Sequence, residues 1–179
     1  SATRFSSAPG FPGDSISIDV YGSADKLKSD IIRYALKDSS GTLWFGTDGG
    51  LVAYTRGKFI HYGVKDGLPH KKILVLFEDQ QRNLWIGTSG GATKFDGTEF
   101  RTYTAKDGLI SDRVRAFSQD RKGNIWIGTK KGVSMYNGSG FQSFTEDNGL
   151  SNNRIRHIIS DQDGDIWFGT YFGGICRFS

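Results

Sequence analysis

The chain has 179 residues, of which 36% are hydrophobic and 23% are charged, and this balance favours one globular domain over a disordered chain. Its 25 glycines show no Gly-x-y period, which excludes collagen and favours the many tight turns of an all-β protein. The net charge of +4 comes without the concentrated basic stripe of a nucleic-acid-binding protein, and no apolar run is long enough to span a membrane.

In chain order, residues 1–14 are predicted to form an N-terminal extension and residues 15–179 one domain of short strands. After a first strand at residues 15–21, the domain divides into four units, near residues 23–62, 64–103, 105–144 and 146–178. Each of the first three units predicts four strands separated by glycine-rich turns, whereas the fourth unit ends after its third strand. We expect residues 15–21 to complete the last unit, because they lie in the register of a fourth strand.

One tryptophan recurs in every unit at an interval of 41 residues, at Trp44, Trp85, Trp126 and Trp167. It lies in the sequence motifs LWFGT, LWIGT, IWIGT and IWFGT, and an aspartate precedes it by six residues each time. Four strands in a repeat of about 40 residues are typical of a β-propeller blade. The sequence therefore predicts an all-β propeller of four four-stranded blades, with the tryptophans packed between blades.

Three assemblies are compatible with this count of strands. The four blades could close into a ring by themselves, with residues 15–21 tying the ends together. Two chains could instead share one eight-bladed ring as a homodimer, or the chain could be a fragment of a larger propeller.

Two columns of basic residues lie where the first strand of each unit begins. Aligning the units places three arginines in one column and three basic residues in the column two positions earlier, and strand geometry puts both columns on the same side. The first strand of a blade lines the central channel, so these cations are expected to crowd its mouth. They need an anionic partner, which is either a bound ligand or the loop carboxylates Asp66, Asp107, Asp112 and Asp147.

The turn after the last tryptophan strand, Thr170-Tyr171-Phe172-Gly173-Gly174, is one residue longer than its counterparts. Its aromatic pair is suited to stack on a sugar ring. The predicted ligand-binding residues are Arg33, Lys72, Arg113, Arg115, Arg154, Arg156, His70, His157, Tyr171 and Phe172.

Catalytic and metal-binding motifs are missing from the sequence. The three histidines lie at different positions of the repeat, and no nucleophile elbow, zinc motif or phosphate loop occurs. The acidic run 161–165 alternates like a calcium loop but lacks the bidentate glutamate further on. We therefore expect no enzyme activity, no cofactor and no metal.

The word Asp-x-x-Gly-x-[Leu/Ile]-Trp-[Ile/Phe]-Gly-Thr, followed by Gly-[Leu/Val] and a downstream Gly-Leu, resembles the two-component regulator propeller repeat. Residues 120–155 carry this pattern almost throughout, and the resemblance extends over roughly residues 15–178. It implies the periplasmic or extracellular sensor portion of a bacterial hybrid two-component system, in which binding of an oligosaccharide controls a histidine kinase outside this segment.

The combined expectation is a non-catalytic sensor propeller that binds an oligosaccharide or another anionic small ligand for two-component signalling. No nucleic acid and no membrane contact are expected for this segment. Two alternatives are an assembly scaffold that binds another protein without a small ligand and, less favoured, a propeller lyase or hydrolase.

Overall fold

The computed structural model describes residues 2–4, 17–19, 21–22, 27 and 29–179. Three sheets have four strands each: β3 (Ile32–Lys37), β4 (Leu43–Thr47), β5 (Leu51–Thr55) and β6 (Lys58–Tyr62); β7 (Ile73–Glu78), β8 (Leu84–Thr88), β9 (Ala92–Phe95) and β10 (Phe100–Tyr103); β11 (Val114–Gln119), β12 (Ile125–Thr129), β13 (Val133–Tyr136) and β14 (Phe141–Phe144). The next sheet holds β15 (Ile155–Ser160), β16 (Ile166–Thr170) and β17 (Ile175–Phe178). One short 3-10 helix follows each four-stranded sheet: η1 (Val64–Asp66), η2 (Ala105–Asp107) and η3 (Glu146–Asn148).

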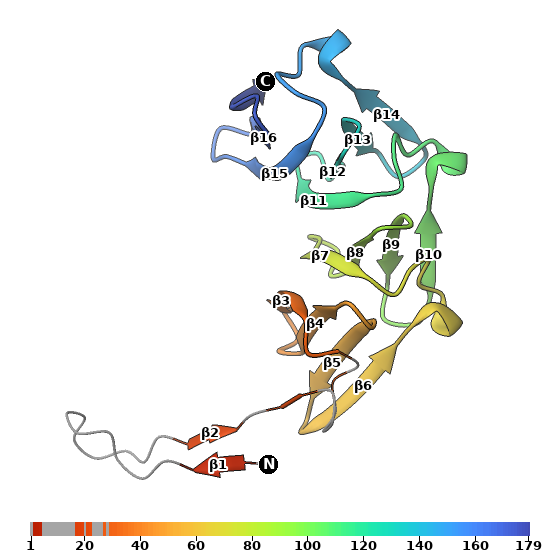
Figure 1. Ribbon diagram of the computed structural model, residues 1–179. Coiled ribbons are helices and arrows are strands. Elements are labelled where there is room, and N and C mark those ends of the chain that lie inside the picture. Colours follow the sequence, from red (N-terminus) through yellow and green to blue (C-terminus); the bar gives the residue numbers. More distant parts are fainter. Residues whose placement is uncertain (1, 5–16, 20, 23–26, 28) are drawn as a thin grey trace, which may run out of the picture.

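The sheets are arranged around an arc. Within each sheet the strands are antiparallel and follow the order of the chain. The first strands of consecutive sheets contact one another, β3 with β7, β7 with β11 and β11 with β15. Figure 1 shows these strands along the inner side of the arc and β6, β10 and β14 along its outer side. The all-β prediction is confirmed, and the radial placement of the sheets is that of propeller blades.

The expected closure of the last blade by residues 15–21 is not what the structure shows. Strand β2 (Ser17–Asp19) pairs with β1 (Ala2–Arg4) in a separate two-stranded sheet, while residues 15, 16 and 20 lie outside the described residues. The last sheet therefore has three strands in the described part of the chain. Pairing with a segment near in sequence costs less free energy than pairing with a distant one, because a shorter loop loses less entropy on closure.

The six-residue interval between aspartate and tryptophan is explained by a hydrogen bond. The indole N–H donates to the aspartate Oδ2 in all four units, from Trp44 to Asp38 at 2.7 Å and from Trp126 to Asp120 at 3.0 Å. The other oxygen of the same carboxylate accepts backbone N–H groups of the turn. The aspartate thus fixes the turn between the first two strands and the orientation of the indole at the same time.

The predicted packing between units is confirmed for Trp44, Trp85 and Trp126, whereas Trp167 of the last unit contacts Arg177 of its own sheet. Trp44 packs edge-on against Phe95 of the following unit, and Trp126 packs against Phe168 of the last unit. The glycine of the Gly-Thr motif lets neighbouring units approach closely. A Cβ on Gly128 of the third unit would lie 2.6 Å from Cγ2 of Ile155 of the fourth. The apolar core of the molecule is therefore a series of interfaces between neighbouring units.

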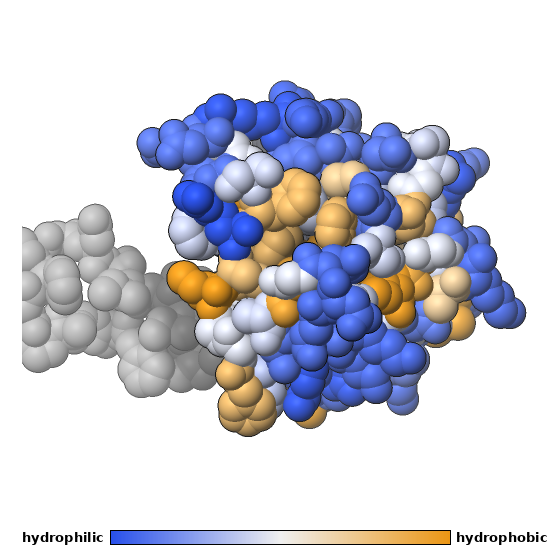
Figure 2. Space-filling model, turned by 90° about the horizontal axis from the view of Figure 1, so that it is seen from above, coloured by the Kyte–Doolittle hydropathy of each residue, from blue (hydrophilic) through white to orange (hydrophobic). Residues whose placement is uncertain are grey.

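The two ends of the arc expose positions that are buried between inner units. Leu51, Ala92 and Val133 are fully buried in one column of the repeat, but Ile175 in the same column is 71% exposed. Figure 2, seen from the side of the C-terminal unit, shows apolar side chains gathered between hydrophilic ones. At the other end, the equivalents of the residues that pack against Trp44 line a hollow of about 320 Å³. This hollow is lined by Tyr21, Leu27, Ile32, Ala35, Leu43, Phe45, Tyr54 and Phe59.

Candidate ligand-binding site

The basic columns of the third and fourth units meet where β11 and β15 begin. Their side chains line a pocket of about 310 Å³ on the inner strands. The pocket is lined by five cationic side chains and one aromatic ring: Arg113, Arg115, Lys130, Arg154, Arg156 and Tyr171. Five of the ten residues predicted to bind a ligand, the four arginines and Tyr171, thus lie together, and binding by them stays a prediction.

The carboxylates that could have neutralised this cluster are used elsewhere. Asp66 accepts the N–H of Gly63, and Asp107 accepts that of Thr104, both at 2.8 Å. Asp112 accepts a backbone N–H from its own loop, and Asp147 accepts a threonine hydroxyl. Within the described part of the chain, the four arginines of the pocket make no ion pair with a carboxylate.

Uncompensated positive charge is visible at individual atoms of the pocket. The Nε of Arg113 is buried and has no hydrogen-bond partner among the described residues. Burial, together with the positive charges of Arg113, Arg156 and Arg154, lowers the pKa of Arg115. Both effects mean that the cluster is held together by the fold at an electrostatic cost, which a bound anion would remove.

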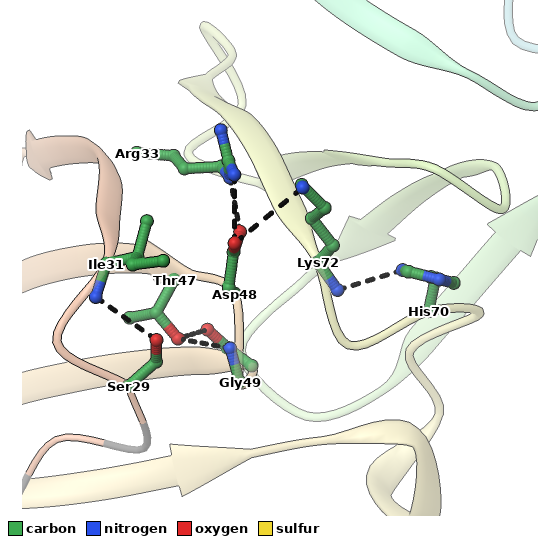
Figure 3. A network of polar contacts seen from close by, with 9 residues as sticks. Ser29, Ile31, Arg33, Thr47, Asp48, Gly49, His70 and Lys72 are labelled. Atoms are coloured by element: carbon green, nitrogen blue, oxygen red, sulfur yellow. Dashed lines mark hydrogen bonds and ion pairs between the residues drawn. The ribbon is translucent and has the colours of Figure 1, made fainter. Parts of the chain in front are cut away.

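Arg33 and Lys72, by contrast, share one carboxylate. Figure 3 shows Asp48 between them. Arg33 donates to both oxygens of Asp48, from Nη2 at 2.9 Å, and Lys72 Nζ lies 3.7 Å from Asp48 Oδ2. The hydrogen bond from Arg33 lowers the pKa of Asp48, so the carboxylate stays charged. These two cations are already paired and lie outside the pocket of the third and fourth units.

The two predicted histidines are also outside that pocket. His70 accepts the backbone N–H of Lys72 on its Nδ1 at 2.9 Å, which fixes the start of β7. His157 lies in β15, opposite Gly169 of β16, and its side chain is exposed. It shares a column with Val75 and Ala116, which are buried against the following unit, so His157 belongs to the free face of the last unit.

Of the two predicted aromatics, Tyr171 lines the pocket and Phe172 does not. The Tyr171 ring is in contact with two guanidinium groups, at 4.4 Å from Arg154 and 4.5 Å from Arg156. Phe172 packs edge-on against Tyr171, with 4.2 Å between ring centroids, and is 89% exposed. Tyr171 therefore holds the arginines in place, and binding of a ligand by Phe172 stays a prediction.

Lys130 was missed by the sequence argument, although the repeat contains the signal. It occupies the position directly after Gly-Thr, which is Asp48 in the first unit and Tyr171 in the last. The backbone N–H of this position bonds the start of the first strand, from Asp48 to Ile31 O and from Tyr171 to Arg154 O. In these two units the bond places the residue beside the basic columns, and Lys130 lines the pocket beside them as well. The charge at this position decides whether the columns are neutralised.

The described residues contain no group of three or more His, Cys, Asp or Glu side chains that could hold a metal ion. No helix among them is long and apolar enough to cross a membrane.

Comparison with known proteins identifies the repeat. The family model described as Two component regulator propeller matches residues 26–49, 67–90, 108–131 and 149–172, once in each unit. No curated protein matches the sequence. The matched segments make up more than half of the chain, and the propeller fold is thereby confirmed.

Solved structures similar to the chain agree with this fold. The extracellular domain of a "putative hybrid two component system" from B. thetaiotaomicron has a TM-score of 0.81 and 25% identity over 94% of this chain. A second such domain from the same organism has a TM-score of 0.72 and 27% identity over 83% of it. The chain spans only 24% of each of these proteins. Virginiamycin B lyase from Staphylococcus aureus has a TM-score of 0.65 over 95% of this chain and 61% of the lyase, and at 15% identity this likeness shows the fold alone.

Proposed function

This chain belongs to the two component regulator propeller family, and we propose that it is a non-catalytic, ligand-binding part of a sensor. Its ligand is an oligosaccharide or another small molecule that carries negative charge. The ligand binds in the pocket lined by Arg113, Arg115, Lys130, Arg154 and Arg156. Occupancy of the pocket is the signal that the sensor transmits.

The observation that carries this proposal is the unpaired charge of the pocket. Five cationic side chains converge on about 310 Å³, and the nearby carboxylates cap turns instead of pairing with them. A buried guanidinium N–H without a partner costs free energy, and hydrogen bonds to a charged group are stronger than neutral ones. An anion in the pocket would satisfy both requirements.

The similar structures support the sensor role and a location outside the cytoplasm. Both are extracellular domains of hybrid two component systems. Because the chain spans a quarter of their length or less, the kinase that would receive the signal is a property we propose for a parent protein.

The test is titration calorimetry with matched charged and neutral probes. Oligogalacturonate is compared with its neutral methyl ester, and a sulfated oligosaccharide with its desulfated form. The variant Arg115→Ala plus Arg156→Ala should weaken binding of a charged probe by about tenfold or more per arginine and leave the neutral probes unchanged. Arg121→Ala, an exposed arginine in the turn at the opposite end of β11, is the matched control.

A second variant uses the repeat itself as its guide. Lys130→Asp places a carboxylate where Asp48 stands in the first unit, so it should pair with the arginines and abolish binding of the charged probes. It should also raise the thermal midpoint, because like charges are replaced by ion pairs. Charged and neutral probes that bind equally well, or binding that survives both variants, would overturn the proposal.

The free end faces favour a second role, and we propose that two copies associate head to tail. The face with Ile159 and Ile175, exposed by 62% and 71%, has the column positions that fill the interfaces between inner units. The hollow at the other end has the positions that receive them. Two copies could therefore bury both faces at once in a ring of eight units.

Light scattering behind a sizing column tests this association. A particle of twice the chain mass of 19.8 kDa supports it, and Ile175→Asp should then return the mass to that of one chain. A single-chain mass at all concentrations would overturn the homodimer and leave the ligand-binding proposal untouched.

A further inference from the structure

A second pocket, of about 310 Å³, lies between the first two units. Three aromatic rings that pack on one another line it, those of Trp44, Tyr62 and Phe95. The carboxylates of Asp38 and Glu78 line it as well. Asp38 follows β3 and Glu78 ends β7, whereas the basic pocket lies where the first strands of the third and fourth units begin. The two pockets are therefore separate and lie at opposite ends of the inner strands.

The indole of Trp44 is partly uncovered because its neighbour on the third strand is small. The residue opposite the tryptophan is Ala53 in the first unit, and it shares one face of the sheet with the indole. The other units carry long side chains at this position: Lys94, Met135 and Arg177. Trp44 is 7% exposed, against 1% for Trp85 and Trp126. The short side chain of Ala53 therefore leaves indole surface open to the pocket.

The last unit shows which group this position can accept. The guanidinium carbon of Arg177 lies 5.6 Å from the centroid of the Trp167 ring. Its Nη1 is 3.5 Å from Oδ2 of Asp165, so the cation has an aromatic face and a carboxylate as neighbours. The face of an indole attracts a cation through its negative potential. The first unit has the indole and nearby carboxylates, but Ala53 supplies no cation.

The two carboxylates of the pocket keep their charge and have no cation partner. Within the described part of the chain, neither Asp38 nor Glu78 makes an ion pair. Glu78 accepts the N–H and the hydroxyl of Ser39, at 2.8 Å and 2.6 Å. Burial opposes the shift, but hydrogen bonds lower the pKa of Asp38, so its carboxylate stays ionised. Both groups retain lone pairs for a further donor.

The net charge of the pocket is negative. Among the described residues one cation lines it, the exposed Arg82, against two carboxylates. In the equivalent pocket between the third and fourth units, two carboxylates are balanced by Arg121 and Lys122. The pocket of the first two units is thus the one of this pair that attracts a cation.

We propose that this pocket binds an organic cation, a guanidinium or ammonium group on an alkyl stem. The charged group lies against the indole of Trp44 and beside Glu78, and the stem packs on the aromatic wall. A volume of about 310 Å³ suits a small molecule or one long basic side chain of another polypeptide. This site goes beyond the proposed function, since it depends neither on the basic pocket nor on association of two copies.

Titration calorimetry with two cations tests the proposal and separates the two sources of the cation. Butylguanidinium represents a free small molecule, and acetyl-Gly-Arg-Gly-amide represents a side chain of a polypeptide. Each is compared with a neutral isostere, butylurea and the same peptide with citrulline. At least one cation should bind about tenfold more tightly than its isostere. Binding of the peptide alone would identify a basic segment of another chain as the ligand.

Two variants locate the binding in this pocket. Ala53→Arg places a guanidinium where Arg177 stands in the last unit, so it should abolish binding of both cations. Glu78→Gln should weaken the cations about fivefold and leave the isosteres unchanged. Glutamine is compatible with the fold here, because Gln119 holds the equivalent position and accepts a backbone N–H of the preceding unit at 2.7 Å.

The control and the outcomes are distinct. Asp147→Asn removes the same charge from an exposed loop after β14 and should leave binding unchanged. Cations that bind no more tightly than their isosteres overturn the proposal, as does binding that Glu78→Gln leaves unchanged. If the thermal midpoint shows that Ala53→Arg does not fold, Glu78→Gln alone decides. The anion site of the third and fourth units stands in either case, because its own variants test it.

Discussion

The same column of the repeat offers a direct test of how the units are stabilised. Leu51 and Ile175 occupy equivalent positions in the first and last units, and each pairs with the glycine of its Gly-Thr word. Leu51 is fully buried against the second unit, whereas Ile175 is 71% exposed. Truncation to alanine removes a similar volume at both sites, so the difference in cost reports burial alone.

The expected magnitudes are well separated. Leu51→Ala removes buried methyl groups and leaves a cavity beside Leu76 and Ile86, which costs about 2–5 kcal/mol of unfolding free energy. Ile175→Ala removes surface that water already reaches, and its cost should stay below about 1 kcal/mol, including the lower β-propensity of alanine.

Urea titration followed by tryptophan fluorescence measures both costs. The titration is made first at a dilution at which light scattering gives the mass of one chain, and then at a concentration at which association would occur. A cost at Ile175 that grows with concentration would show that a second copy covers this face. A cost at Ile175 equal to that at Leu51 in the dilute monomer would refute the argument that burial between units sets stability.

Three further predictions concern the scaffold. Asp120→Asn should cost about 1–3 kcal/mol at pH 6, because an amide N–H faces the indole N–H of Trp126. Burial opposes the shift, but hydrogen bonding lowers the pKa of Asp120. The wild-type chain should therefore lose this stability as the pH falls below 3.8, whereas the variant should not. Urea titration at pH 6 and pH 3 checks this difference. Arg82→Gly should raise the unfolding free energy by about 1 kcal/mol, since Arg82 has a φ of 65° where other units have glycine, and an unchanged midpoint would contradict this. Gly128→Ala should cost about 1–3 kcal/mol by forcing the next unit away, while Gly140→Ala, with open space around it, should cost far less in the same titration.

The repeating positions made most of the fold predictable. The spacing of Asp120 and Trp126 indicated a turn and a packed indole, and the structure joins them by one hydrogen bond. The pairing of residues 15–21 was not predictable in the same way. A period-two pattern predicts a strand and its buried face, but several free sheet edges can accept such a strand. The partner is then decided by which edge lies near, and Ala2–Arg4 provided one.

The site was predictable where a column alone decides the position of a side chain. Arg113 and Arg154 follow from strand register, because both precede an inner strand at the same point. Whether these cations are neutralised depends on the loop position after Gly-Thr, and no pattern within a single unit shows that this position touches the next unit. Asp48 neutralises its neighbours there, and Lys130 does not.

Different positions of the repeat thus stabilise the packing between units and set the charge of the pocket. The aspartate and tryptophan of every unit form a hydrogen bond, and the glycines of the first three units make close contacts, so these residues cannot change without loss of stability. The side chain at the position after Gly-Thr contacts the basic columns instead of the interfaces between units, as Asp48 does with Arg33 and Tyr171 does with Arg154. An aspartate at this position pairs with the basic residues of the two columns, whereas a lysine or a tyrosine leaves them without a carboxylate partner. Under the proposed function, we therefore expect substitutions at Lys130 to change ligand binding without disturbing the packing between units.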